Sequence, residues 1–405
     1  MIALTLAALA LAPLPPQQAT RSDDPLSQVE IGWKGKTYAG PALPLEVGPG
    51  PPAAAEAWAA WTLEHDYRMT LTDDARVLLI THQKNGKFGR QLELVHRTEK
   101  EFDRILPEPE REEEVVEEEV PEDPTGELPE DPDGGPAGWT PEGLEPLPYT
   151  YSYEWGVGTW KVDTETCVMF IVRDEEDYGD LVETLGEMQD YLKPWVEKGK
   201  TFTGFVHERP MVAAYIANAS GQEEWDPDNE LVHRVAQMLF VRRFSSFQPY
   251  WLAQGLAWHI ENELRGAIYC FPYRSEFVWA TEHTGWDKEL KSRFKDRDDQ
   301  PLQASEFATW KRGKYEAEFA RVAFGFAGFF DRYHQEDLSP FCEEVRLFAI
   351  EDNKVDLGDG NWERVTDYQV SIEDQLLFLK KHFGDEVLED VTGYFAKGKR
   401  FKLSR

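Results

Sequence analysis

Two neighbouring stretches in the middle of the chain decide how it folds. They read Leu231-Val232-His233-Arg234-Val235-Ala236-Gln237-Met238-Leu239-Phe240 and Trp251-Leu252-Ala253-Gln254-Gly255-Leu256-Ala257. In the first stretch, apolar residues recur at helical spacing from Leu231 to Leu239, and Pro249 suits the first turn of a second helix. The pattern predicts a core helix pair over 228–264, with Asp226 or Asp228 capping its start.

The polar residues of this pair have the spacing of a metal site. His233 and Gln237 lie four residues apart, so they stack on one side of the first helix, as two metal ligands from one helix must. Gln254 is the matching polar residue on the second helix, where small neighbours predict a close approach of the two helices.

The helix pair resembles the gluzincin (thermolysin-type) metallopeptidases, particularly the secreted bacterial peptidase-MA-like group. In that family a helix of the type L-x-H-E-x-x-H-x-L-L is followed by W-L-x-E-G-L-A. This chain reads L-V-H-R-V-A-Q-M-L-F and then W-L-A-Q-G-L-A, so the apolar frame matches at nearly every step. The resemblance extends over about 67–395, and its specific part is the helix pair.

The resemblance implies a degenerate zinc site. His233 matches the first zinc ligand, Gln237 the second, Gln254 the glutamate ligand and Arg234 the carboxylate that activates water. A catalytic zinc ion needs three protein ligands, and this frame supplies one, because neutral amides bind zinc poorly. The Arg234 cation cannot accept a proton, and its charge disfavours a nearby Zn²⁺. We therefore expect no catalytic residue and no metal or other cofactor here, and a vestigial cleft formed by these four residues.

Three alternatives stay open at this point. A register shifted to Asn229-Glu230-Leu231-Val232-His233 keeps a glutamate and a histidine at the E-x-x-H spacing. His233, Gln237 and Gln254 would instead form a satisfied buried hydrogen-bond set without any ligand. The third alternative is an active metal-dependent peptidase that uses zinc with a non-standard ligand set.

Other chemistry-bearing residues lack a supporting pattern. His259 lies five residues after Gln254, about 140° around the helix, and should face elsewhere. The pair His207-Glu208, together with His283 and His334, is predicted to be structural. The sequence contains no G-x-S-x-G, Walker or Rossmann glycine motif, so serine-nucleophile, nucleotide and dinucleotide chemistry have no support.

The net charge of −33 is concentrated in one segment. Residues 107–148 contain sixteen acidic residues and ten prolines against one arginine, Arg111, and are predicted to be a disordered insertion. This charge balance excludes a nucleic-acid partner, because binding to nucleic acid needs clustered Lys and Arg residues. Residues 396–405 form a short basic tail that we interpret as a solvated terminus.

The N-terminus indicates export. Residues 1–19 contain an apolar run too short to cross a bilayer, which is typical of a signal peptide, and no later segment predicts a transmembrane span. The predicted location is therefore extracellular, periplasmic or in the cell envelope. The three cysteines lie far apart, and Cys167 is predicted to be a buried, inert thiol.

The order of elements predicts an α+β fold, with a small mixed β-sheet subdomain packed on a helical zincin-like subdomain. A Pro/Ala-rich segment over 20–60 precedes a strand-helix start at 61–106, and the domain resumes over 149–395. The expected strands and helices follow apolar periodicity. The strands are 67–71, 76–80, 167–172 and an edge strand at 211–217; the helices are 89–105, 174–191, 228–243, 249–264, 314–335 and 370–395.

These observations predict an exported, non-catalytic pseudopeptidase with a structural or ligand-binding role. In the binding case, the edge strand Met211–Ala217 would pair with an extended peptide or protein segment, as the equivalent strand does in the family that the chain resembles. The sequence leaves the oligomeric state open.

Overall fold

A computed structural model describes most of the chain beyond its first segment. The described residues are 28–33, 36–41, 61–62, 64–72, 76–84, 86–107, 166–208, 210–219, 226–270, 285–295, 300–311, 315–358, 361–364 and 368–403, with a few isolated positions. The strands within 28–41 and 354–364 are described by their backbone alone. The predicted signal peptide, all of the acidic insertion after residue 107 and His283 lie outside these residues.

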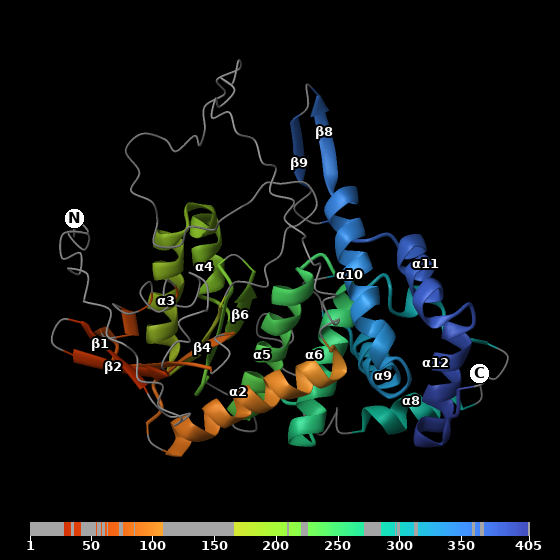
Figure 1. The fold of residues 1–405 in the computed structure, drawn as a ribbon, viewed down its shortest axis with the longest axis horizontal. Coiled ribbons are helices and arrows are strands. Elements are labelled where there is room, and N and C mark those ends of the chain that lie inside the picture. Colours follow the sequence, from red (N-terminus) through yellow and green to blue (C-terminus); the bar gives the residue numbers. More distant parts are fainter. Residues whose placement is uncertain are drawn as a thin grey trace, which may run out of the picture.

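A five-stranded mixed sheet forms one half of the fold (Figure 1). Its strands are β3 (Arg68–Leu71), β4 (Val77–Thr81), β5 (Cys167–Val172), β6 (Gly204–His207) and β7 (Val212–Ile216). They lie in the order β3-β4-β5-β7-β6, in which β4, β5 and β7 run parallel and the two outer strands run antiparallel to their neighbours. All residues of the three parallel strands are buried, as expected where both faces of a sheet are covered.

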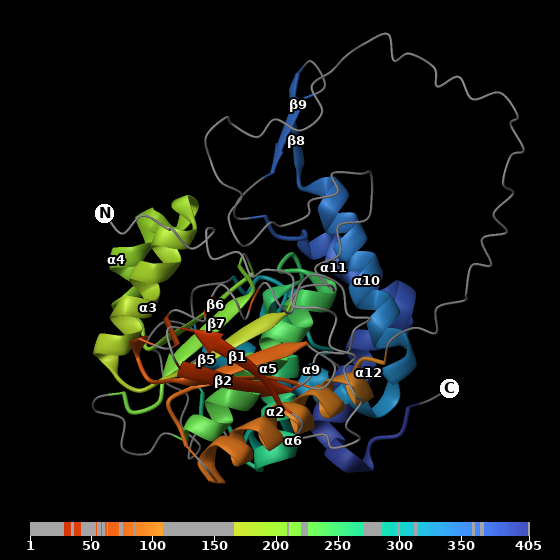
Figure 2. The same ribbon diagram turned by 60° about the vertical axis from the view of Figure 1, so that its left-hand side comes forward.

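Helices supply that cover on both faces (Figure 2). On one face lie α3 (Glu175–Met188), the 3₁₀ segment η2 (Asp190–Trp195) and α4 (Val196–Gly199). The opposite face packs on α2 (Gly86–Ile105) and α5 (Pro227–Phe244), and α6 (Tyr250–Arg265) packs against α5. Alternate residues of one strand serve the two cores: Met169 of β5 packs with the α5 side, and Phe170 with the α3 side.

The remaining elements complete a helical half beyond α6. They are α8 (Trp286–Phe294), η3 (Ala304–Glu306), α9 (Ala317–Tyr333), α10 (Gln335–Asp352), α11 (Ile372–Phe383), α12 (Val387–Lys397) and η4 (Gly398–Arg400). Two hairpins, β1 (Gln28–Trp33) with β2 (Lys36–Pro41) and β8 (Lys354–Gly358) with β9 (Asn361–Arg364), are not part of the hydrogen-bonded sheet, although β2 lies against β3. The α+β class predicted from the sequence is confirmed. Within the described residues, no helix combines the length and hydropathy needed to cross a bilayer.

Helix α5 is the central helix of the fold. Asp226 caps its start by accepting a hydrogen bond from the Asp228 N–H at 2.9 Å, and Pro227 occupies the first turn. Fourteen of its eighteen residues are buried, because the sheet, α2 and α6 surround it. Its polar side chains must therefore find partners inside the protein.

The predicted edge strand is not at the edge. β7 is bonded to β5 on one side and to β6 on the other, so the prediction for Met211–Ala217 was wrong. The edge is β6, a four-residue strand that the sequence analysis missed because Gly204–His207 is too short to show a period.

Two helical predictions also need correction. The helix expected over 370–395 is two helices, because the chain turns at Gly384, whose φ of +95° is one that L side chains rarely adopt. Helix α10 was missed, and Pro340 inside it weakens the helical pattern of its sequence.

Gly255 allows a close approach, but with a different helix from the one expected. A Cβ atom at this position would lie 2.2 Å from the backbone oxygen of Ala323 in α9. The absence of a side chain at Gly255 thus sets the distance between α6 and α9, whereas the small residues were expected to bring α5 and α6 together.

We predict that Gly255→Ala destabilises the fold by about 1–3 kcal/mol or more, because the added methyl group must displace the backbone of α9. The matched control is Gly179→Ala in α3, where a Cβ meets no atom within 4 Å. That change should stabilise the protein by about 0.5–1 kcal/mol. Urea unfolding of both variants measures the difference, and equal stabilities would contradict the packing described for Gly255.

Asp331 of α9 contacts side chains from three other helices. Its carboxylate lies 2.8 Å from His259 Nε2 of α6 and accepts hydrogen bonds from Arg104 of α2 and Gln335 of α10, each at 2.7 Å. Burial alone would raise the pKa of Asp331, but the contacts with His259 and Arg104 outweigh it and hold that pKa well below its usual range.

This depressed pKa predicts a specific acid sensitivity. Below about pH 4 the unfolded chain takes up a proton at Asp331 while the folded protein does not, so stability present at neutral pH is lost as the pH falls. Asp331→Asn should therefore lower the free energy of unfolding at pH 7 and reduce its further fall between about pH 5 and 3. Asp190→Asn, at an exposed carboxylate paired with Lys193, is the control. The same pH profile for Asp331→Asn and for the unaltered protein would refute the assignment.

Candidate ligand cleft and the side-chain cluster behind it

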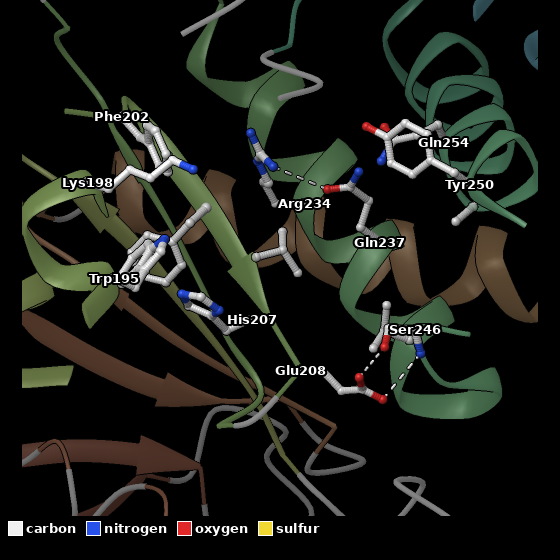
Figure 3. A pocket seen from close by; sticks show the side chains of 15 residues that line it. Trp195, Lys198, Phe202, His207, Glu208, Arg234, Gln237, Ser246, Tyr250 and Gln254 are labelled. Atoms are coloured by element: carbon white, nitrogen blue, oxygen red, sulfur yellow. Dashed lines mark hydrogen bonds between the residues drawn. The ribbon is translucent and has the colours of Figure 1, made fainter. Parts of the chain in front are cut away.

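A cleft of about 280 Å³ lies between the edge strand β6 and the helix pair α5 and α6 (Figure 3). Its size is just below the range of roughly 300–1,000 Å³ typical of ligand pockets. Its lining residues come from the segment around α4, from β6 and from the two helices. They are Trp195, Lys198, Phe202, Gly204, Phe205, Val206, His207, Glu208, Arg234, Gln237, Val241, Ser246, Tyr250, Ala253 and Gln254.

Strand β6 presents free backbone groups along this cleft. The Thr203 carbonyl accepts a hydrogen bond from the Ile216 N–H at 3.0 Å, so in the antiparallel ladder Phe205 and His207 also direct their backbone groups toward β7. The intervening residues, Gly204 and Val206, direct theirs to the open side. Within the described sheet, no further strand pairs with that side.

Arg234, which the resemblance matches to a general base, lines the cleft. Its side chain is 4% exposed, and its Nε donates a hydrogen bond to Glu230 at 2.6 Å while Nη1 donates to Gln237 at 3.3 Å. The pair of opposite charges compensates the burial of both groups. In the shifted register Glu230 would be the base, but here its carboxylate is held by the Arg234 guanidinium.

His233 is fully buried and is not among the residues that line the cleft. Its Nδ1 lies 3.2 Å from Glu261 Oε2, and its ring centroid lies 5.8 Å from that of Trp258. Burial lowers the pKa of His233 well below its usual value, the Arg234 charge lowers it further, and the nearby Gln254 amide opposes these effects. The imidazole is therefore neutral at physiological pH.

The structure separates the four residues that the resemblance grouped. Arg234, Gln237 and Gln254 line the cleft, whereas His233 belongs to a cluster behind it, with Gln254 between the two. Three buried atoms of these residues lack a hydrogen bond of good geometry among the described residues. They are both ring nitrogens of His233 and the Oε1 atom of Gln254. The fully satisfied set considered from the sequence is thus not what these side chains form.

The cluster contains two residues that the sequence analysis did not identify, Glu261 and Cys270. The ligand atoms of His233, Glu261 and Cys270 all lie within 4.8 Å of one another, and all three residues are buried. Burial raises the pKa of Glu261 to about 8 and that of Cys270 well above its usual value. Glu261 lies seven residues after Gln254, two helical turns, so helical spacing alone would place both on one face. Cys270 lies outside the helix, and no sequence pattern indicates its position.

The turn after α6 carries Cys270 back to the helices. Gly266, with φ +72°, ends α6. The Asn229 amide donates to the Ala267 carbonyl at 2.7 Å and to Glu261 Oε1 at 2.9 Å, and the Tyr269 N–H also donates to Glu261 Oε1. These hydrogen bonds hold the turn against α5 and α6 without a ligand.

His207 and Glu208 also line the cleft, although the sequence analysis treated them as structural. His207 packs edge-on against Trp195 at 4.4 Å between ring centroids, and Glu208 accepts a hydrogen bond from the Ser246 N–H at 3.2 Å (Figure 3). These two residues reach the cleft because β6 pairs with β7 at the edge of the sheet. The order of the strands cannot be derived from the sequence, so their position in the cleft could not be predicted. His259 contacts Asp331 on the other side of α6, as expected.

Comparison of the sequence with models of protein families and with curated proteins finds no match.

We predict that Glu230→Gln destabilises the protein by about 3–5 kcal/mol, because it leaves the buried Arg234 cation without its anion. The control is Glu183→Gln, which removes the carboxylate of an exposed pair with Lys200 and should cost about 0–1 kcal/mol. Denaturant unfolding compares the two. A loss of stability at Glu230 no larger than at Glu183 would show that Arg234 is solvated.

Proposed function

We propose that this protein is a non-catalytic binding protein of peptidase-like architecture, which takes an extended peptide segment into the cleft beside β6. The observation that carries the proposal is the combination of an edge strand with free backbone groups and a helix wall from which the expected base and ligands are missing. Strand addition gives affinity through the backbone and selectivity through pockets for alternate side chains.

The cleft wall fits binding better than hydrolysis. Arg234 matches the position at which a metallopeptidase of the resembled family has a carboxylate base. Its charge is already neutralised by Glu230. Gln237 and Gln254 supply amide groups, which suit hydrogen bonds to a peptide better than bonds to zinc. In the described residues, the three side chains grouped closely enough to share a metal ion, His233, Glu261 and Cys270, are not among those that line the cleft.

The lining also indicates the character of the peptide. Trp195, Phe202, Phe205 and Tyr250 provide aromatic surface near the strand and the start of α6. Lys198 is the other cation on the wall besides the paired Arg234. We therefore expect apolar side chains at alternate positions of the bound segment to fill the cleft. Export of the protein is proposed on the apolar run of residues 1–19.

Hydrogen exchange tests this proposal directly. An array of eight-residue peptides selects binders, and mass spectrometry then compares exchange in the free and bound protein. A bound peptide should slow exchange in the segment containing Gly204 and Val206, and in the helix segments around Gln237 and Gln254. The peptide should be recovered intact after incubation.

Two substitutions at Val206 separate backbone pairing from side-chain contact. Val206→Pro removes one free N–H without breaking the bonds to β7 and should abolish binding, while Val206→Ala keeps the N–H and should retain most of it. Equal effects of the two changes would refute strand addition. Chelator-sensitive cleavage of the bound peptide would refute the non-catalytic assignment.

A further inference from the structure

We propose that His233, Glu261 and Cys270 form a zinc site that fastens the turn after α6 to the centre of the fold. This set differs from the one that the resemblance implies, since it shares only His233 with it. The ion would lie behind the cleft and join three segments: α5 through His233, the last turns of α6 through Glu261, and the following turn through Cys270.

The donor atoms have the chemistry and spacing of a zinc site. Thiolate, imidazole and carboxylate are the three ligand types that zinc takes in proteins. With bonds of about 2.0–2.3 Å, tetrahedral zinc places its donors roughly 3.3–3.6 Å apart. The Nδ1 of His233 and the Oε2 of Glu261 lie 3.2 Å apart, and one ligand atom from each of these two residues lies within 4.8 Å of Cys270 Sγ. Zinc binding would draw these donors together to the tetrahedral spacing.

A second observation points to a ligand at this place. Although they are fully buried, Glu261 Oε2 and both ring nitrogens of His233 lack a well-formed hydrogen bond among the described residues. Buried polar atoms of this kind usually have a partner, and a site for a bound ion is one recognised reason for an exception. The other carboxylate oxygen, Oε1, is already taken by Asn229 and Tyr269, so Oε2 is the atom left to bind the ion.

The surroundings support the ligands as a metal site requires. Trp258 Nε1 donates a hydrogen bond to Cys270 Sγ at 3.0 Å, which stabilises a thiolate and fixes its position. The Glu261 carboxylate is oriented by Asn229, and the Gln254 amide lies beside the imidazole. Such outer contacts orient ligands and tune their affinity.

The charges at the site balance when zinc is bound. Glu261 as carboxylate and Cys270 as thiolate supply two negative charges against Zn²⁺, while His233 binds as a neutral ring. The nearby Arg234 cation does not change this sum, because it is paired with Glu230. The three protein ligands leave one position of a tetrahedral ion open.

Cobalt substitution tests the proposal on the full-length chain. After chelator treatment and dialysis, titration with Co²⁺ should give one equivalent of binding with thiolate-to-cobalt charge-transfer absorption, and one equivalent of Zn²⁺ should displace it. Cys270→Ala should lose this absorption, and zinc should no longer raise its melting temperature. The matched control is Cys342→Ala, which removes another fully buried free thiol and should retain both properties.

A second variant covers the case in which Cys270→Ala does not fold. Glu261→Gln preserves the volume of the side chain but removes the anionic ligand, so it should bind Co²⁺ more weakly while keeping the charge-transfer absorption from Cys270. No thiolate-to-cobalt absorption in the unaltered protein would overturn the proposal. Equal loss of the absorption in Cys342→Ala and Cys270→Ala would also overturn it.

Discussion

The ion pair between Arg234 and Glu230 is the interaction on which the centre of this protein depends. Both side chains belong to α5, which the sheet and two helices enclose, and each is almost completely shielded from water. An unpaired charge there would be strongly unfavourable, whereas partners four residues apart on one helix satisfy each other locally. The position that would carry a catalytic base in the resembled family thus contributes to the packing of the central helix.

Two sites lie near this ion pair. On the β6 side, a cleft with amide and aromatic groups and an open strand edge is suited to a peptide backbone. On the far side, a histidine, a carboxylate and a thiol come together out of contact with solvent. The Gln254 side chain lies between them, so a ligand in the cleft and an ion in the cluster would act on the same residue from opposite sides.

Apolar periodicity was enough to predict the α+β class, the strands β3, β4 and β5, and both helices of the central pair. It did not give the order of the strands, because pairing joins segments far apart in the chain. The apolar composition of Val212–Ile216 is typical of a strand buried on both faces, which is where the structure places it. The edge position that we expected for this strand did not take that composition into account. Of the cluster, Glu261 has a helical spacing from Gln254 that points to it. The approach of Cys270 depends on the turn at Gly266, which no pattern in the sequence predicts.

The contact at Gly255 has a consequence for how the cleft accommodates its contents. With the backbones of α6 and α9 in direct apposition there, that wall cannot recede without separating two helices of the core. The opposite wall is built from the four-residue helix α4 and the short strand β6, which is bonded to one neighbour among the described strands. A cleft that adjusts to ligands of different width would therefore do so by movement of the α4 and β6 wall, while the helix wall keeps its position.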